Sequence, residues 1–115
     1  MGNVTEHLIK GSNNDIVLTL TEDGSTISVT WTQLDIVFSG ITITRTTSQD
    51  GIDFASGVLT ITPGSLDASS LASVAALENG SLHRAYITVT SLAEPGGVLY
   101  GGPDSDDTLH FYVTS

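Results

Sequence analysis

The sequence predicts an all-β domain, a sandwich of two sheets with about seven strands. Ser and Thr contribute 30 of the 115 residues, and many of them alternate with Ile, Val and Leu. That period of two is typical of strands with one buried and one exposed face. Turn signals recur roughly every 8–12 residues, as they do in sandwiches. One composition runs through the chain, without a linker or a repeat, so residues 1–115 are expected to form a single domain.

Seven segments have the alternating pattern, and their apolar faces would form the core. They comprise residues 16–20, 27–32, 34–38, 41–44, 59–62, 85–90 and 109–113. Residues 52–54 and 98–100 are candidates for two further short strands. Trp31 is the largest residue on these apolar faces, so we expect it to be the largest single member of the core.

Pairs that contain glycine or proline predict the turns. Residues 22–25 indicate a hairpin, because Asp23-Gly24 accepts the positive φ angles of a tight turn. Ser39-Gly40 separates two strands so closely that it requires a tight turn or a bulge. Asp50-Gly51 predicts another turn, and Pro63-Gly64 ends a strand.

One segment departs from the strand pattern and predicts a short helix. Residues 65–78 are rich in Ala, Ser and Leu, and Asn79-Gly80 can close a helix at its C-terminus. Four residues in the segment follow helical spacing: Leu71, Val74, Ala75 and Glu78. We expect this helix to lie across one end of the sheets as a crossover connection.

The two remaining stretches, residues 1–11 and 101–107, have the composition of loops or arms. We expect residues 1–11 to form a flexible N-terminal arm that becomes ordered on contact with a partner. Residues 1–7 have neither a cationic start nor an apolar run, so we do not expect a signal peptide there.

The charge balance excludes several classes of partner. The chain has 3 Lys and Arg residues against 13 Asp and Glu residues, and its net charge is −10. Binding to nucleic acid or to an anionic membrane needs clustered cations, so neither partner is expected. The chain has no cysteine, which excludes thiol catalysis and a cysteine zinc site. Its apolar runs are too short to span a membrane.

Three carboxylates near the C-terminus are the candidate metal ligands. Asp104, Asp106 and Asp107 lie in a stretch rich in Gly and Pro, and Ca²⁺ takes oxygen ligands from such loops. The spacing does not complete an EF-hand, because the required glycine and closing glutamate are missing. The alternative is a solvated loop between two strands.

Catalytic residue sets do not emerge from the sequence. His7, His83 and His110 could serve as metal ligands or as an acid and base, but they lack HxH or HExxH spacing, and solvent-facing strand positions are the alternative. The carboxylates near the turns are ordinary turn residues, and no serine lies in a nucleophile elbow. We expect no enzyme activity and no cofactor.

Three tyrosines are the candidate partner interface. Tyr86, Tyr100 and Tyr112 fall on late strands and are expected to share their outward faces. Exposed aromatic rings there could stack on a sugar or become buried in a protein partner. The alternative is cross-strand packing beneath a loop.

Taken together, the sequence resembles the small immunoglobulin-like β-sandwich domains of tailed-bacteriophage virion proteins. The resemblance runs from Lys10 to Val113, and its five segments are listed in chain order. They are the early strand after a polar arm (residues 10–20), the acidic hairpin (22–25), the strand Gly57-Val58-Leu59-Thr60-Ile61-Thr62, the strand Arg84-Ala85-Tyr86-Ile87-Thr88-Val89 and the closing strand Leu109-His110-Phe111-Tyr112-Val113. Residues 65–78 are longer than the usual connection of the family.

The resemblance implies a non-enzymatic structural protein of the virion, most often a capsid decoration or cement protein and otherwise a tail or baseplate component. It implies assembly in the host cytoplasm onto a larger virion protein, the major capsid or tail protein, in symmetric copies, so that the chain is oligomeric in the particle. A Thr-rich sandwich without an export signal fits this setting. The alternative is a carbohydrate-binding or adhesion module of a bacterial surface protein, which would use Tyr86 or Tyr112.

Overall fold

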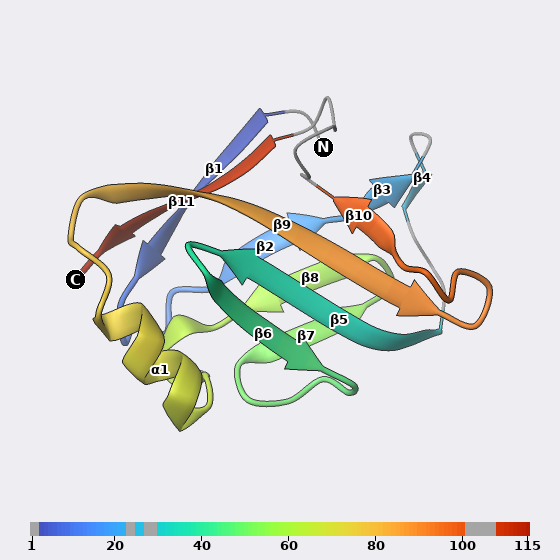
Figure 1. Ribbon diagram of the computed structural model, residues 1–115, viewed down its shortest axis with the longest axis horizontal. Coiled ribbons are helices and arrows are strands. Elements are labelled where there is room, and N and C mark those ends of the chain that lie inside the picture. The colour runs from blue at the N-terminus through green and yellow to red at the C-terminus, as the bar shows by residue number, and fades with distance from the viewer. Residues whose placement is uncertain (1–2, 23–24, 27–29, 101–107) are drawn as a thin grey trace.

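The computed structural model describes residues 3–22, 25–26, 30–100 and 108–115, and it confirms an all-β sandwich of two sheets (Figure 1). The large sheet contains β1 (Asn3–Ile9), β5 (Trp31–Phe38), β6 (Ile41–Arg45), β9 (Ser81–Ser91), β10 (Val98–Tyr100) and β11 (Thr108–Thr114). The small sheet contains β2 (Ile16–Thr19), β7 (Ile52–Ala55) and β8 (Val58–Ile61). A separate hairpin joins β3 (Thr21–Glu22) to β4 (Ser25–Thr26).

The strand order is that of an immunoglobulin-like sandwich. The large sheet runs β1-β11-β9-β5-β6, with β10 also paired to β9, and the small sheet runs β2-β8-β7. Counted along the chain, β11-β9-β5-β6 and β2-β8-β7 correspond to the G-F-C-C′ and B-E-D orders of the variable-type fold. Strand β1 extends the large sheet by pairing in parallel with the last strand.

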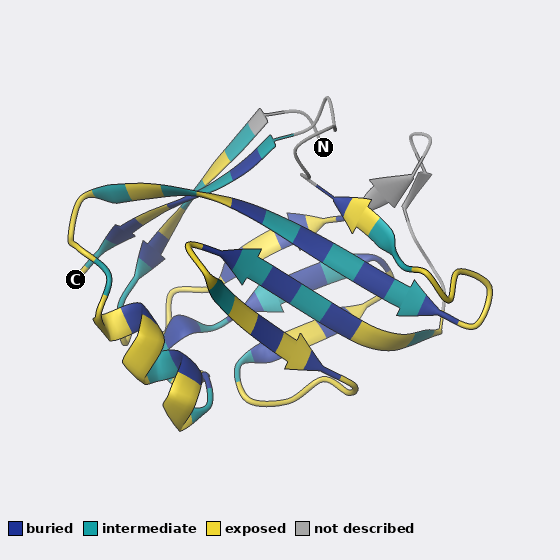
Figure 2. Cartoon of the chain, viewed as in Figure 1, coloured by how far each residue is buried: buried dark blue, intermediate teal, exposed yellow. Residues whose placement is uncertain are grey.

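The core lies between the inward faces of the two sheets, where alternate residues of each strand are buried (Figure 2). Phe38 of β5 and Phe111 of β11 are its largest fully buried side chains, and their rings meet edge to face at 5.0 Å and 83°. Burial of each such ring contributes about 1.5–3 kcal/mol. These two rings, rather than a tryptophan, are the centre of the core.

Trp31 is only half-buried, so the expectation that it is the largest core member was wrong. It begins β5 at the border of the core, where its ring packs against Phe54 with centroids 5.9 Å apart. The indole N–H donates a hydrogen bond to the Phe54 carbonyl at 3.1 Å. A tryptophan needs a partner for this N–H, and the position at the border supplies it.

Both residues have positive φ in three two-residue turns, of which Ser39-Gly40 and Ser56-Gly57 close the β5–β6 and β7–β8 hairpins and Asp50-Gly51 closes the bridge between Gln49 and Ile52. The φ angles are 49° and 75° at Ser39-Gly40, 47° and 79° at Asp50-Gly51, and 51° and 78° at Ser56-Gly57. This is the type I′ geometry that matches the twist of the flanking strands. The first two turns confirm predictions, and the third was not predicted. The hairpin at residues 22–25 is also confirmed, because Glu22 pairs with Ser25; residues 23–24 lie outside the described chain.

The seven predicted segments correspond to six of the observed strands. Residues 27–29 lie outside the described chain, and the described residues of segments 27–32 and 34–38 fall largely in the single strand β5, with an irregular register between Trp31 and Gln33. The short candidates 52–54 and 98–100 are confirmed as β7 and β10.

The predicted helix is present as α1 (Ala68–Ala75), preceded by the 3-10 turn η1 (Pro63–Ser65). It connects β8 of the small sheet to β9 of the large sheet and lies at one end of the sandwich (Figure 1), which confirms the crossover. Asp67 caps its N-terminus by accepting a hydrogen bond from the Ser70 amide at 3.2 Å. Val74 anchors the helix to the core.

Residues 1–11 were expected to form a flexible arm, and the structure corrects this for residues 3–9. Residues 3–9 form β1, which pairs with β11 from Asn3↔Thr108 to Ile9↔Thr114. Val4 packs against the core and Leu8 is 1% exposed, while Thr5 and His7 face outward. The backbone hydrogen bonds of the pairing and the burial of Leu8 hold the segment to the sheet.

Candidate binding surface

The large sheet has the most strands of the described sheets, and its outer face is the candidate binding surface. Buried residues alternate with partly exposed ones along each strand, so the second set points away from the core. The outward residues are Thr5, His7 and Ile9 of β1; Thr108, His110, Tyr112 and Thr114 of β11; Leu82, Arg84, Tyr86, Thr88 and Thr90 of β9; Gln33, Asp35 and Val37 of β5; and Thr42 and Thr44 of β6.

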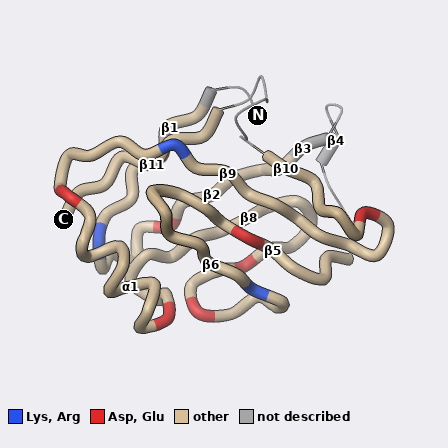
Figure 3. Tube along the Cα trace, viewed as in Figure 1, with Lys and Arg blue, Asp and Glu red and all other residues tan. Residues whose placement is uncertain are grey.

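This face carries little charge although the protein is strongly acidic. Asp35 is the one carboxylate among the described outward residues, and it accepts hydrogen bonds from Gln33 at 2.9 Å and Thr44 at 2.5 Å. Glu6 occupies an inward-phase position of β1, and the other carboxylates in view lie in loops, turns and the small sheet (Figure 3). The centres of protein interfaces are depleted of charge in the same way, because burying an unpaired charge is costly.

An exposed apolar row crosses three strands at one end of this face. Tyr112 of β11 lies opposite Leu82 of β9 on one side and His7 of β1 on the other. Tyr112 is 39% exposed and Leu82 is 56% exposed. The His7 and Tyr112 rings tilt against each other with centroids 5.3 Å apart, and the His7 Nε2 lies 2.7 Å from the Thr114 hydroxyl. These three residues form the His7–Tyr112–Leu82 row.

A second row crosses the middle of the face. Tyr86 of β9 lies opposite Val37 of β5, which lies opposite Thr42 of β6. Tyr86 and Val37 are half-buried. This row places two half-buried apolar side chains beside Asp35, so the outer face combines apolar groups with hydroxyls.

The three predicted tyrosines do not share one surface. Tyr86 and Tyr112 face outward as expected, but on different rows. Tyr100 is 5% exposed and belongs to the core, so its assignment to the interface was wrong. Strand β10 has only three residues, and Tyr100 pairs with inward-facing Ile87, which leaves Leu99 as the outward residue at 49% exposure. Such a short strand does not reveal from sequence which of its faces is buried.

The outer-face residues that the tyrosine prediction missed are His7 and Leu82. Leu82 lies four positions before Tyr86 on the same strand. Extending the predicted strand 85–90 back to residue 81 would have placed both side chains on one face. His7 was hidden because its segment was interpreted as an arm.

The three histidines lie on adjoining strands but do not form one site. His7 and His110 face outward, whereas His83 lies on the opposite side of β9, where its Nε2 is 2.8 Å from the Ser81 hydroxyl. Within the described residues, no cluster of three or more His, Asp or Glu side chains could hold a metal ion. Asp104, Asp106 and Asp107 lie outside the described residues, so their Ca²⁺ site stays a prediction.

Two of the three cations of the sequence are engaged at the helix α1. Lys10 donates hydrogen bonds to the carbonyls of Ala75, at 3.2 Å, and Leu77 at the C-terminal end. Arg45 is 8% exposed, and its Nη2 lies 2.6 Å from the Asp67 carboxylate at the N-terminal end. Only Arg84 lies on the outer face of the large sheet. The structure therefore gathers no basic surface.

Asp67 joins three interactions. Its carboxylate accepts hydrogen bonds from the Ser70 hydroxyl at 2.7 Å, from Arg45 at 2.6 Å and from the Ser70 amide. The hydrogen bond from the Ser70 side chain, followed by that from Arg45, lowers the pKa of Asp67 from 3.8 to about 2. The remaining guanidinium donors of Arg45 reach the carbonyls of Thr44, Gln49 and Asp50, so this cluster fixes the loop after β6 to the helix.

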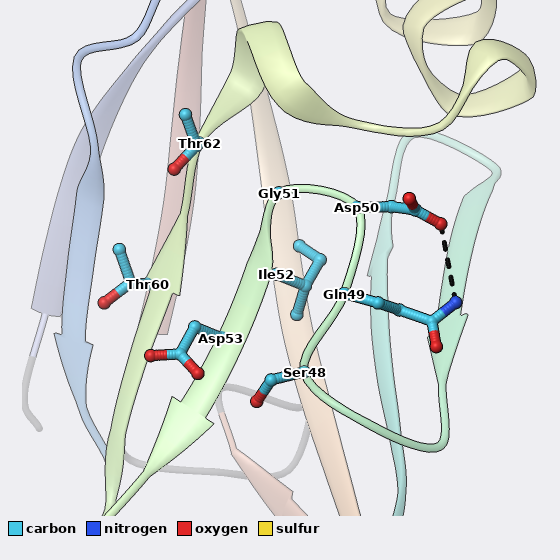
Figure 4. A pocket seen from close by; sticks show the side chains of 8 residues that line it. All are labelled: Ser48, Gln49, Asp50, Gly51, Ile52, Asp53, Thr60 and Thr62. Carbon is cyan, nitrogen blue, oxygen red and sulfur yellow. Dashed lines mark hydrogen bonds between the residues drawn. The ribbon is translucent and has the colours of Figure 1, made fainter.

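A shallow hollow lies beside the Asp50-Gly51 turn, at the border of the small sheet (Figure 4). It encloses about 270 Å³ and is open to solvent. Its lining residues are Ser48, Gln49, Asp50, Gly51, Ile52, Asp53, Thr60 and Thr62. Asp53 and Thr60 lie opposite each other in the sheet, and Gln49 donates a 3.4 Å hydrogen bond to Asp50. None of these residues is aromatic, so the hollow lacks the stacking surface of a typical sugar site.

Comparisons with protein-family models, with curated proteins and with solved structures find no match for this chain. Among the described residues, no helix has the length and apolar character needed to cross a membrane. We therefore infer the function from the surface itself.

Proposed function

We propose that this protein is a non-enzymatic structural component of a tailed-phage virion, and that it attaches to a larger virion protein through the outer face of its large sheet. A capsid decoration or cement role is the leading form of this proposal, with a tail or baseplate role second. The observation that carries it is the low charge of this face, with its exposed His7–Tyr112–Leu82 row, in a protein of net charge −10.

The physical reason lies in the cost of removing water. A face with one carboxylate, which already accepts two hydrogen bonds, loses little on desolvation. Leu82 and Tyr112 gain about 25 cal/mol for each Å² of apolar surface that the partner covers. The carboxylates elsewhere on the surface keep separate copies apart in solution and favour a partner with cations around its binding site.

A protein that attaches in symmetric copies does not need a large interface for each copy. A decoration protein that binds many equivalent sites on one particle can use a modest interface, because each copy binds a site that the lattice already presents. A rigid sandwich with an exposed sheet face suits this role, since little conformational entropy is lost on binding.

Paired substitutions test the surface. Leu82→Lys should strongly reduce the amount of protein that sediments with particles, because it places a charge in the proposed contact. Val17→Lys is the matched control, since Val17 is 54% exposed on the outer face of the small sheet. Both variants should keep the wild-type unfolding midpoint. Equal sedimentation of the two variants would remove this face from the proposal.

A carbohydrate-binding or adhesion role is the second candidate, favoured by the exposed Tyr112 ring beside His7. It predicts that Tyr112→Ala abolishes binding on a glycan array while leaving the fold intact. Tyr86→Ala on the neighbouring row is the comparison, because Tyr86 is the other outward tyrosine. Absence of any glycan signal from the wild-type protein would eliminate this candidate.

A further inference from the structure

We propose that β1 is an exchangeable strand, which can leave its own β11 and pair with the β11 edge of a second copy of this chain. The proposal concerns association between copies of the domain and stands independently of the virion role. It follows from how β1 is held, how its connection to β2 is fixed and what its departure would expose.

Strand β1 is held more weakly than the other long strands. It lies at the edge of the large sheet, where β11 is its one paired neighbour among the described strands, and the pairing is parallel (Figure 1). Parallel pairing is slightly less stable per residue than antiparallel pairing. Leu8 is its one buried side chain among residues 4–9. Releasing β1 therefore gives up much less apolar burial than unfolding the domain, so local opening should precede global unfolding.

The connection after β1 forms a defined pivot. Lys10 donates hydrogen bonds to α1, and the Ser12 carbonyl accepts a 2.7 Å hydrogen bond from the Gly64 amide. Between them, Gly11 has a φ of 66°, and nothing lies within 4 Å of the position that a Cβ would occupy. Contacts on both sides of Gly11 thus hold the connection to the body of the protein, while β1 itself lies beyond them. Once the backbone hydrogen bonds from Lys10 to Thr114 and from Ser12 to Ile9 open, together with the Lys10 side-chain contacts, rotation at Gly11 would swing β1 outward and withdraw Leu8 from the core.

The occupant that fits the exposed edge is β1 from another copy. Departure of β1 leaves a row of unpaired backbone groups on β11 and an empty position where Leu8 had been buried. The β1 of a second copy has the same seven-residue register and places the same leucine in that position. The exchanged dimer therefore uses the same contacts as the closed monomer. An identical segment regains every contact of the closed form.

Protein concentration and salt set the balance between the closed form, with β1 on its own β11, and the exchanged form, with β1 on the β11 of a second copy. The attached strand has a high effective concentration at its own β11, so the isolated chain stays closed when dilute. Two copies of net charge −10 repel each other, and added salt weakens this repulsion. Exchange should therefore increase with protein concentration and with ionic strength.

The absence of native cysteine permits a clean test. Thr5 and His110 are opposite each other on the outer face, so single Thr5→Cys and His110→Cys variants can be mixed at high concentration in high salt. After incubation, a thiol-reactive cross-linker that spans neighbouring strands is added and covalent dimers are measured by electrophoresis. We expect several-fold more mixed dimer than in a mixture of Thr5→Cys with Thr42→Cys. Thr42 is exposed on β6, at the opposite edge of the sheet.

The double variant Thr5→Cys/His110→Cys is the internal check. In dilute solution it should cross-link within one chain, which verifies that the cross-linker detects the β1–β11 pairing. The closed, cross-linked chain should no longer exchange β1. Equal dimer yields from the two mixtures, including no dimer in either, would overturn the proposal.

Discussion

The Nη2 of Arg45, at the end of β6, lies 2.6 Å from the Oδ1 of Asp67, the residue that caps α1. Arg45 is 8% exposed, whereas about a third of the Asp67 side chain remains in contact with solvent. The pair therefore connects the edge of the large sheet with the crossover helix at the border of the core. The other hydrogen bonds of Arg45 and Asp67 go largely to backbone groups. We therefore interpret the pair as a contact that stabilises the fold.

Removing the carboxylate should destabilise the fold. Asp67→Ala leaves the guanidinium of Arg45 buried without its counter-charge and removes the cap of α1, so we expect a loss of about 2–4 kcal/mol in the free energy of unfolding. Urea denaturation monitored through Trp31 fluorescence measures it. Asp53→Ala is the control, because Asp53 is an exposed carboxylate on β7, and it should change stability by less than about 0.5 kcal/mol. Equal losses in both variants would contradict the assigned role of the pair.

The same carboxylate predicts a pH dependence. Its pKa in the folded protein, about 2, lies below the ordinary value of 3.8, so its stabilisation is complete above pH 4 to 5 and is lost as the pH falls toward 2. Because the carboxylate is partly exposed, we expect this contribution to be about 1–2 kcal/mol. Asp67→Asn should therefore lie below the wild type in unfolding free energy at pH 6, with the difference narrowing at pH 2. A constant difference at both pH values would show that the charge of Asp67 does not stabilise the fold.

Gly64 should not tolerate a side chain. A Cβ atom there would lie 2.7 Å from the Gly11 carbonyl oxygen and 2.9 Å from that of Ser12, both of which are backbone atoms. We expect Gly64→Ala to cost about 1–3 kcal/mol in unfolding free energy, because the loop after β1 must shift. Gly96→Ala is the matched control, with nothing within 4 Å of the added atom. A Gly64→Ala variant as stable as Gly96→Ala would show that the two loops are not packed as described.

Alternation along the chain was sufficient to predict the sandwich because most strands have one buried and one partly exposed face. Strand β9 illustrates this, since Ala85, Ile87 and Val89 are all buried. The prediction failed where one face of a strand lacked that regularity. Glu6 lies between Val4 and Leu8 on the side of β1 that faces the core. This polar residue interrupts the apolar alternation, so the segment was interpreted as a polar arm.

The candidate site was only partly predictable for a related reason. Tyr112 and Tyr86 were found because aromatic residues on outward phases are visible in the sequence. The neighbours of Tyr112 in its row depend on which strands lie beside β11. One of these strands is β1, from the other end of the chain, and the other is β9. The contact between Arg45 and Asp67 likewise spans 22 positions, and nothing in the local pattern indicates it.

We propose that this domain is part of a virion particle. Quantitative mass spectrometry of purified virions, produced by cells that carry this sequence, tests it most directly. We expect peptides of this chain in many copies per particle, in a fixed ratio to the major capsid or tail protein. Complete absence of the chain from purified particles would show that the protein is not a virion component.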